Sequence, residues 1–349
     1  MKLDLKSMTK EELTSYIQGL GEPSFRSRQI FRWIHRGVST LDEMTDLPKS
    51  LKEKLSENTY VVTLRVFKRF QSQMDETVKY LFELEDGNII ETVAMKYHHG
   101  YSLCISSQVG CRMGCAFCQS TKNGLVRSLS AGEILDQILK VQQDLGVRIT
   151  NIVMMGIGEP LDNFDNVVRF LKIVNDPDGI NIGYRHISLS TCGLIPGIQR
   201  LAELELPITL SISLHATNDK KRSAIMPVNR KYDLQKLISA CRDYQAHTGR
   251  RISFEYSVIA GINDSYEDAK QLSVLLKGIL YHVNLIPVNP IEEGGYRPPS
   301  RKNVMAFQAA LTKLGLNATI RRTLGSDISA SCGQLRHQNS EKGGNAPCN

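Results

Sequence analysis

The sequence predicts an α/β fold: a partial (β/α)6 TIM-like barrel, preceded by a small helical domain and an antiparallel β meander. Three observations predict this order. Residues 9–58 have helical apolar spacing, residues 61–97 form strand-like runs separated by turn residues, and from residue 102 onward short apolar runs alternate with helical stretches. Alternation of the last kind is typical of a parallel sheet with helical crossovers. We therefore expect a helical accessory domain at 1–60, a β extension at 61–97, a barrel core at 98–335 and a polar tail at 336–349.

The first 60 residues carry the pattern of three short helices. Thr9 is a capping candidate directly before Lys10-Glu11-Glu12, and the helix that follows places its apolar residues on one face. A second helix is expected over 24–35, with Gly37 as its stop, and a third begins near Pro48, a residue suited to a first helical turn. Short helices of this kind make a small accessory domain.

The rest of the chain up to residue 287 carries strand signals. Runs at 62–67, 77–84 and 89–95, with Asp86-Gly87-Asn88 as the turn between the last two, predict an antiparallel meander. Six further apolar runs lie at 103–105, 149–155, 186–190, 208–214, 252–259 and 283–287. Their spacing leaves room for helical crossovers, which suits six parallel strands in an open or partial barrel.

Composition excludes several classes of protein. At 349 residues and 41% hydrophobic residues, the chain is long enough for one large core and a small accessory domain. Residues 1–10 are charged and lack the apolar segment of a secretion signal, so the eight cysteines do not indicate a disulfide framework. No apolar run approaches the roughly 20 residues of a membrane span. We therefore expect a cytoplasmic protein with reduced thiols and no membrane partner.

The net charge of +7 has the sign expected of a protein that binds phosphate. The basic residues gather in small groups, and any one group is more typical of a solvated surface than of a binding patch. The groups are Arg26, Arg28, Arg32 and Arg36; Lys220, Lys221 and Arg222; Arg230 and Lys231; Arg250 and Arg251; and Arg321 and Arg322. Together they are compatible with RNA and do not establish it.

Three cysteines, Cys111, Cys115 and Cys118, form a Cys-x3-Cys-x2-Cys run without a fourth ligand close behind it. A structural zinc site closes with four ligands, and an ordinary four-iron cluster also uses four cysteines, so three leave one iron open to a small molecule. A zinc knuckle is the alternative, but it needs its other ligands at a short regular spacing, whereas the next candidates downstream are His186 and Cys192. The spacing therefore favours a cluster with one open iron.

Polar residues follow the predicted strands at the edge where a barrel has its active site. The second run leads into Gly156-Ile157-Gly158-Glu159-Pro160, which is similar to a dinucleotide fingerprint, but Leu161 stands where the third glycine belongs. A carboxylate such as Glu159 accepts hydrogen bonds from an amine. The other candidates at strand ends are Ser190, Ser213-Leu214-His215 and Asn289. Four strand ends that meet the cysteine loop indicate one shared site.

The cysteine run closely resembles the signature of radical S-adenosylmethionine (SAM) enzymes. The chain up to about Leu335, including its helical N-terminus, is similar to the bacterial radical SAM methyltransferases that act on carbon 2 of adenine in 23S rRNA and tRNA. The segments that carry this resemblance are 90–93, 104–110, 155–163, 213–216, 226–229, 284–290 and 331–335.

The resemblance implies a radical SAM core with two cofactors, a [4Fe-4S] cluster and SAM. In that superfamily the amine and carboxylate of SAM chelate the open iron of the cluster, and one electron cleaves SAM to a 5′-deoxyadenosyl radical. The resemblance makes Cys111, Cys115 and Cys118 the cluster ligands. The implied SAM-binding residues are Gly158, Glu159, Ser190, Ser213, Leu214, His215 and Asn289.

The resemblance also implies three catalytic residues. Cys332 is methylated by one SAM, a radical from a second SAM removes a hydrogen from that methyl group, and the thiomethylene radical adds to carbon 2 of adenine. Cys104 then attacks the sulfur of Cys332, which releases methylated adenine and leaves a disulfide to be reduced, and Glu91 matches the proton acceptor. Because a cysteine nucleophile needs thiolate character, we expect a depressed pKa for Cys104 or Cys332. Cys192, Cys241 and Cys348 match no family role.

Two other functions stay open at the level of sequence. The nearest is the sister group that methylates carbon 8 of the same rRNA adenine and confers antibiotic resistance, although Pro160, Ala216 and Pro287-Val288 favour the carbon-2 group. The other is a non-catalytic iron-sulfur RNA-binding protein, which would leave Glu91, Cys104 and Cys332 without a role.

The carbon-2 interpretation implies several partners. They are 23S rRNA, tRNA and a one-electron reductant such as flavodoxin, and the protein itself is expected to be a monomer. The helical domain at 1–60 is the candidate RNA-binding region, and the target adenine is expected to be unstacked or flipped to reach a deep site.

Overall fold

The computed structural model describes residues 2–289, 295–335 and 338–339. Within that part of the chain, the centre is one mixed sheet of eleven strands, in the order β14-β13-β12-β11-β10-β9-β6-β5-β4-β3, with β15 (Gln338–Asn339) paired to β5. Seven of these strands are parallel: β6 (Gly100–Cys104), β9 (Ile149–Met154), β10 (Ile187–Thr191), β11 (Thr209–Ser213), β12 (Ile252–Val258), β13 (Tyr281–Pro287) and β14 (Ala318–Ile320). The six predicted parallel strands are confirmed, and β14 is an addition.

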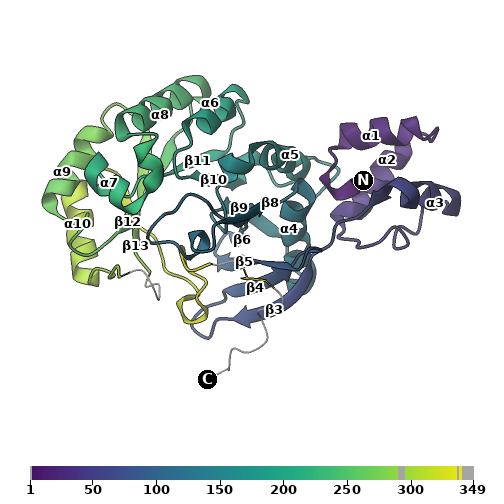
Figure 1. Ribbon diagram of the computed structural model, residues 1–349, viewed down its shortest axis with the longest axis horizontal. Helices are drawn as coiled ribbons and strands as arrows, with labels where there is room; N and C mark the ends of the chain where they lie inside the picture. Colours follow the sequence, from purple (N-terminus) through teal and green to yellow (C-terminus); the bar gives the residue numbers. More distant parts are fainter. Residues whose placement is uncertain (1, 290–294, 336–337, 340–349) are drawn as a thin grey trace.

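Helices cover the outer side of the parallel strands (Figure 1). They are α4 (Ala131–Leu145), α5 (Phe164–Asn175), α6 (Ile195–Glu203), α8 (Leu234–Thr248), α9 (Tyr266–Leu275) and α10 (Arg301–Lys313). The short α7 (Asp219–Ile225) lies instead at the carboxyl ends of the strands, where its Ile225 packs in the cluster that includes Cys192. In the described residues no pairing joins β14 to β3, so the sheet is an open, partial barrel, as the sequence predicts.

Strand β12 shows how the two faces of the sheet differ. Phe254, Tyr256 and Val258 are fully buried in the main apolar core beneath the helices. Because side chains alternate along a strand, Glu255 and Ser257 point the other way, into the barrel, where they line a cavity. The barrel therefore has an apolar outside and a partly polar inside.

The antiparallel meander consists of β3 (Arg65–Gln71), β4 (Val78–Glu83) and β5 (Asn88–Tyr97), and β5 pairs with β6. The first predicted strand, 62–67, is displaced by a few residues. The reason is that Val62 and Leu64 are buried in a linker, where their backbone N–H groups donate to Asp4 Oδ1 (3.0 Å) and Asp136 Oδ2 (2.7 Å).

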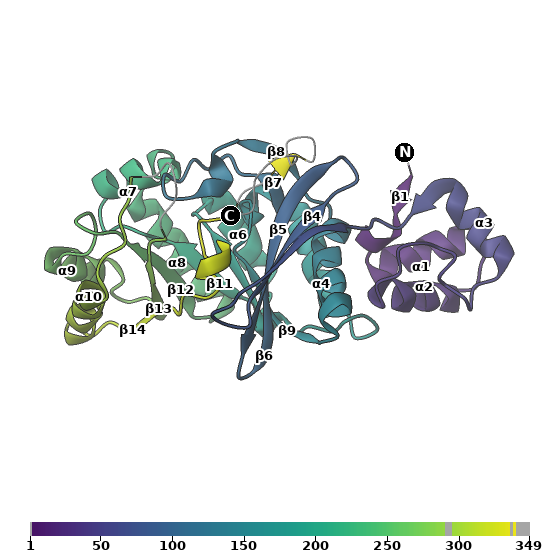
Figure 2. The same ribbon diagram turned by 90° about the horizontal axis from the view of Figure 1, so that it is seen from below.

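The three N-terminal helices are confirmed as α1 (Lys10–Gly19), α2 (Phe25–His35) and α3 (Lys49–Asn58). Thr9 caps α1 in a capping box with Glu12, as its spacing predicts. Two short strands, β1 (Leu3–Asp4) and β2 (Thr59–Tyr60), pair in parallel and bring the two ends of this region together. The helices lie at one end of the molecule, beyond α4 (Figure 2).

A small hairpin, which the sequence did not predict, frames the cysteine loop. It pairs β7 (Gln108–Gly110) with β8 (Leu125–Ser128), so residues 111–124 form the loop between them.

None of the helices in the described residues is long and apolar enough to cross a bilayer. Apart from the pair Gln338–Asn339, the predicted tail at 336–349 lies outside the described residues.

Candidate active site

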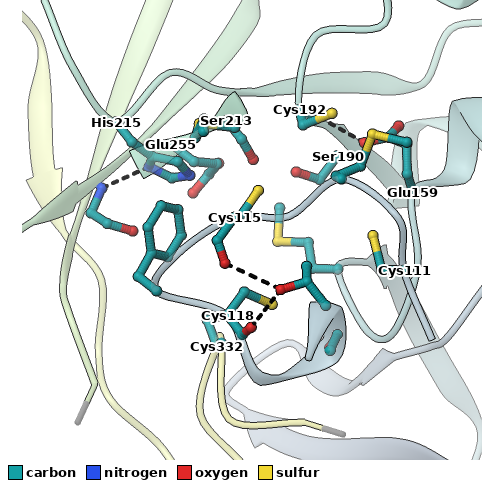
Figure 3. A pocket seen from close by; sticks show the side chains of 18 of the residues that line it. Cys111, Cys115, Cys118, Glu159, Ser190, Cys192, Ser213, His215, Glu255 and Cys332 are labelled. Atoms are coloured by element: carbon teal, nitrogen blue, oxygen red, sulfur yellow. Dashed lines mark hydrogen bonds between the residues drawn. The ribbon is translucent and has the colours of Figure 1, made fainter. Parts of the chain in front are cut away.

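A cavity of about 150 Å³ lies at the carboxyl ends of β9 to β13, next to the cysteine loop. The predicted site residues that line it are Cys111, Cys115, Cys118, Gly158, Glu159, Ser190, Ser213, His215, Asn289 and Cys332. Figure 3 shows the side chains of all of them except Gly158 and Asn289, which it does not label, converging from the strand ends, the loop and the C-terminal segment. Leu214 does not line the cavity, because its side chain is fully buried in the main core.

The three loop cysteines face one cavity, and the loop is held by its own hydrogen bonds. Cys111 N donates to Gly124 O at 2.9 Å, and Thr121 Oγ1 donates to Cys118 O at 3.0 Å. Burial raises the pKa of the Cys111 thiol to about 12 and that of Cys115 well above its usual range. Thiols in such a site become thiolates only with a strong positive partner such as a metal centre.

The donor set fits a cluster better than a single ion. Among the described residues, no group of three or more His, Cys, Asp or Glu side chains converges on one point as a zinc ion requires. A four-iron cluster binds each thiolate at a different iron, so its ligands surround a volume instead. Cys111, Cys115 and Cys118 around one cavity match that requirement.

The glycines of the loop 156–160 serve protein packing. A Cβ on Gly156 would lie 2.6 Å from Ile105 O, and Gly158 has φ +108° with its Cβ position 2.6 Å from Gln108 Cβ. Only glycine allows this approach and this backbone conformation. The loop thereby lies directly on the segment 105–108, and no room for a dinucleotide phosphate is created.

Glu159 is held at the end of that loop. Its Oε2 accepts from Cys192 N at 2.7 Å and its Oε1 from Leu161 N at 3.1 Å, while its own N–H donates to Gln108 Oε1 at 2.9 Å. The carboxyl is buried, and this burial raises its pKa. An amine donor entering the cavity would meet a fixed carboxylate.

His215 has a defined ring orientation. Ser257 N donates to its Nδ1 at 2.9 Å, so the proton of the neutral ring lies on Nε2, and Phe117 packs edge-on against the ring. Burial lowers the pKa of His215 to about 3. The ring is therefore neutral at physiological pH and offers one N–H donor.

Arg222, which the sequence analysis treated only as one of several surface basic residues, is fully buried behind the cavity wall. Its guanidinium donates to Cys192 O (2.7 Å), Ser213 O (3.0 Å) and Leu214 O (3.0 Å). It thus clamps the ends of β10 and β11, which carry Ser190, Ser213 and His215.

Two further cavity residues, Glu255 and Arg321, were missed. Glu255 is 3% exposed, and its Oε1 accepts from Ser253 Oγ and Asn284 Nδ2, both at 3.0 Å. Arg321 directly follows β14, and negative charge on the nearby Cys332 sulfur raises the pKa of its guanidinium. The polar alternation Ser253, Glu255, Ser257 within an apolar strand was a signal that could have found Glu255.

Cys332 and Cys104 are both free thiols in the structure. Cys332 lines the cavity, and its backbone carbonyl accepts from Asn289 Nδ2 at 3.0 Å. Cys104 lies behind the wall, in an apolar cluster with Ile157 and Leu335. Burial, with the neighbouring Cys332 as the next cause, raises the pKa of Cys104 to about 12. The expectation of a depressed pKa is therefore wrong for Cys104, because burial in an apolar cluster raises the pKa by more than the nearby Arg321 cation lowers it.

Glu91 does not line the cavity. It lies on β5, 3% exposed, with Lys79 Nζ 3.4 Å from its Oε2. Lys79 Nζ also donates to Ser329 O at 3.3 Å, which places this pair beneath the C-terminal segment that carries Cys332.

Comparison with known proteins agrees with this geometry. The family model "Radical SAM superfamily" matches residues 105–272, and the model "Ribosomal RNA large subunit methyltransferase N-terminal domain" matches residues 3–61. A crystal structure of a radical SAM methyltransferase from Sphaerobacter thermophilus has a TM-score of 0.91 and 43% sequence identity, covering 95% of this chain and 99% of that one.

Curated relatives are similar over nearly their whole length. A protein of Alkaliphilus oremlandii named probable dual-specificity RNA methyltransferase RlmN is 55% identical over 97% of this chain and 98% of its own. One of the same name from Clostridioides difficile is 50% identical, with coverage of 97% and 98%. Radical SAM enzymes use a [4Fe-4S] cluster and SAM, which the cavity suits. The chain belongs to the RlmN family of radical SAM RNA methyltransferases.

Proposed function

We propose that this enzyme methylates carbon 2 of adenine in 23S rRNA and in tRNA, with Cys332 as the methyl carrier and Cys104 as the resolving thiol. The observation that carries the proposal is the pair of free thiols at one wall of the cavity, Cys332 facing it and Cys104 directly behind. The names of the relatives as dual-specificity RNA methyltransferases support the two substrates.

The chemistry of the substrate explains the cofactors. Carbon 2 of adenine is electron-poor and has no acidic proton, so it cannot displace the methyl group of SAM as a nucleophile. The cluster and SAM, when bound, supply the one-electron chemistry that this carbon requires. Cys111, Cys115 and Cys118 hold the cluster, and Glu159 accepts hydrogen bonds from the SAM amine.

The remaining SAM contacts come from strand ends that the protein holds rigid. Ser190, Ser213, His215 and Asn289 line the cavity, and Asn289 also donates a hydrogen bond to the backbone carbonyl of Cys332. Gly158 provides the close approach that places Glu159, and Leu214 supports its neighbours from the core.

Release of the product is the task of Cys104. Its thiolate attacks the sulfur of Cys332, so that an S–S bond forms as the bond from sulfur to the methylene carbon breaks. The electron pair of the broken bond stays with the carbon, which takes up a proton to become methyl. A dithiol reductant then restores both thiols. Glu91 is proposed as the acceptor of the proton that carbon 2 loses, its charge balanced by Lys79. The radical adduct must also lose one electron before Cys104 attacks, and this electron passes to the cluster when the cluster is bound.

The partners follow from the same assignment. The 1–60 domain is proposed to bind RNA, since α2 presents Arg28 and Arg32, which are 59% and 54% exposed at their side chains. Both already contact Asp178, so RNA phosphate would compete for them. We propose a cytoplasmic monomer that receives single electrons from a reductant of the flavodoxin type.

Two variants test the mechanism. With cluster-loaded protein, SAM, a reductant and unmodified RNA, Cys332→Ala should abolish methylation because no carrier is left. Cys104→Ala should instead accumulate protein joined covalently to RNA, visible as a shifted band that nuclease removes. Full methylation by either variant would contradict the proposal.

The carbon-8 alternative finds no support in the comparisons. The non-catalytic RNA-binding alternative is set aside, because the chain belongs to a family of methyltransferases.

A further inference from the structure

Gln137 lies in the middle of α4 and is fully buried between that helix and the sheet. Its Oε1 accepts from Thr92 Oγ1 at 2.7 Å and from Ser106 N at 2.9 Å, and its Nε2 donates to Ser106 O at 2.9 Å. The side chain therefore holds both backbone polar groups of Ser106 and ties them to β5.

Ser106 is the point where three parts of the active site meet. Its Oγ donates to Glu91 O at 2.7 Å and accepts from Ile157 N at 3.0 Å, in the loop that leads to Glu159. Cys104 precedes Ser106 by two residues, and Glu91 directly precedes Thr92. The amide side chain thus adds to the pairing of β5 with β6, in which Val93 lies opposite Cys104, in holding the segments of Cys104 and Glu91 relative to each other.

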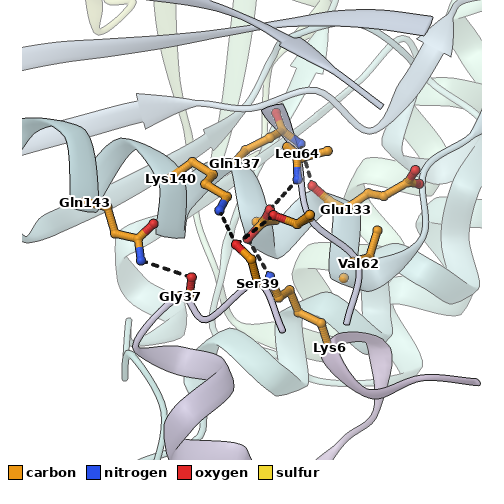
Figure 4. Close-up of polar contacts among 12 residues, drawn as sticks. Lys6, Gly37, Ser39, Val62, Leu64, Glu133, Gln137, Lys140 and Gln143 are labelled. Carbon is orange, nitrogen blue, oxygen red and sulfur yellow. Dashed lines mark hydrogen bonds and ion pairs between the residues drawn. The ribbon is translucent and has the colours of Figure 1, made fainter. Parts of the chain in front are cut away.

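The helix that carries Gln137 is anchored on its other side. Lys6 Nζ lies 2.7 Å from Asp136 Oδ1, and both side chains are fully buried. Lys140 Nζ donates to Ser39 Oγ at 3.0 Å and Gln143 Nε2 to Gly37 O at 3.0 Å. Figure 4 shows these contacts between α4 and the N-terminal region. Because α4 is fixed in this way, Gln137 holds Ser106 against an immobile support.

We propose that Gln137 is a positioning residue for product release, which keeps Cys104 aligned with the sulfur of Cys332. The inference rests on the proposed function. Gln137 is fully buried and does not line the cavity. Its effect falls on the one step in which a buried thiol must reach a second sulfur in line with the bond that breaks.

The inference predicts a specific defect. Loss of the Gln137 side-chain amide leaves the N–H and C=O of Ser106 without these partners in a buried place, so the segment shifts or loosens. The RNA adduct still forms on Cys332, but Cys104 attacks it less often. Adduct should accumulate as it does in Cys104→Ala, to a smaller extent.

The test compares Gln137→Leu with Gln142→Leu, a matched change in the same helix. Gln142 Oε1 accepts from Ile149 N at 2.9 Å, at the far end of α4. Both variants should bind cluster and cleave SAM as the parent does. Gln137→Leu removes the hydrogen bonds to Thr92 and to both backbone groups of Ser106, so it should raise the ratio of trapped adduct to methylated product by more than about tenfold, the scale of one lost buried hydrogen bond. Gln142→Leu should leave the ratio unchanged.

Two further variants keep the test informative if Gln137→Leu folds poorly. Thr92→Val removes only the hydrogen bond from Thr92 Oγ1 to Gln137, at nearly constant volume, and should raise the same ratio by a smaller factor. Gln137→Glu should be competent when protonated, since the acid can donate to Ser106 O, and should stall once ionised. Its adduct ratio should rise with pH, opposite to the parent, whose Cys104 gains thiolate as pH rises.

The charged and titratable groups around position 137 are Glu133, Asp136 and Lys140 on α4, Glu91 on β5, Cys104 on β6 and Lys6 from the N-terminal region. Arg127 pairs with Glu133, and Lys6 pairs with Asp136. All of these groups are present in the parent and in Gln142→Leu, so the adduct ratio of those two proteins against pH measures what the groups contribute.

The outcomes distinguish a failure of the proposed function from a failure of the inference about Gln137. If the parent methylates and Cys104→Ala traps adduct, the proposed function holds. Gln137 is then a positioning residue if its variants raise the adduct ratio. If Gln137→Leu and Thr92→Val lose methylation and adduct together, and Gln137→Glu has the pH profile of the parent, Gln137 is only a structural residue and the inference is wrong.

Discussion

The buried ion pair between Lys6 and Asp136 should dominate the docking of the N-terminal region. Both side chains are 0% exposed, with Nζ and Oδ1 2.7 Å apart, and Asp136 Oδ2 accepts a hydrogen bond from Leu64 N at 2.7 Å. Lys6→Met keeps the length of the side chain but leaves a carboxylate buried without its cation. Removing one partner of such a pair costs about 3–5 kcal/mol.

The double variant Lys6→Met/Asp136→Asn removes the stranded charge, while the amide oxygen introduced at position 136 can still accept from Leu64 N. It should recover at least about 1 kcal/mol of the loss. Lys54→Met is the matched control, because Lys54 and Glu22 lie 2.6 Å apart at the surface, with side chains 47% and 18% exposed. That change should cost less than about 1 kcal/mol.

Urea denaturation followed by circular dichroism measures all three variants. Equal losses for Lys6→Met and Lys54→Met would refute the reasoning, because burial would then have no effect on the cost. A double variant no better than Lys6→Met would show that the loss comes from packing and not from the unpaired charge.

Three further predictions concern titration and backbone geometry. Burial raises the pKa of Cys104 to about 12, so the rate at which this thiol is alkylated in the intact protein should rise about tenfold per pH unit between about pH 8 and 10. Peptide mapping measures this rate, and an alkylation rate that reaches a plateau below about pH 9 would be inconsistent with a buried thiol. Burial lowers the pKa of His35 from 6.5 to about 3, so the folded state binds fewer protons at this residue than the unfolded state does. The contribution of His35 to the free energy of unfolding is therefore complete above pH 6.5 and falls by about 1.4 kcal/mol per pH unit below it. His35→Asn should reduce the slope of stability against pH in acid by that amount, whereas an unchanged slope would exclude His35 as a cause. Gly158→Ala should abolish SAM binding, measured by calorimetry, at unchanged iron content, because Gly158 has φ +108° and a Cβ there would lie 2.6 Å from Gln108 Cβ. Gly183→Ala is the control and should bind SAM normally, since the atom nearest to a Cβ at position 183 is 3.7 Å away.

The sequence predicted the elements that have a strong period. Thr9 with Glu12 and the apolar runs of β9 to β13 have local signals that packing then reinforces, so their positions agree with the structure to within a few residues. β14 is only three residues long and follows α10 closely, too short a run for periodicity to separate it from a loop. Missing β14 also meant that Arg321 was not placed at the site.

The site residues that belong to a sequence motif were predictable, and those whose role depends on their burial were not. Glu159 directly follows Gly158, which the structure shows to be required, and the spacing of the cysteine loop predicted the superfamily that the comparisons confirm. Arg222 and Glu255 lie in ordinary-looking segments, and their importance comes from depth in the barrel, which no single sequence gives. The pKa of Cys104 was misjudged for the same reason, since function alone suggested a thiolate and the apolar surrounding opposes it.

The central claim is methylation of carbon 2 of adenine, and the most direct measurement is nucleoside mass spectrometry of unmodified 23S rRNA and tRNA after anaerobic incubation with cluster-loaded protein, SAM and a reductant. The account predicts new 2-methyladenosine in both RNAs. Appearance of 8-methyladenosine, or no methylated adenosine despite an intact cluster and SAM cleavage, would contradict it.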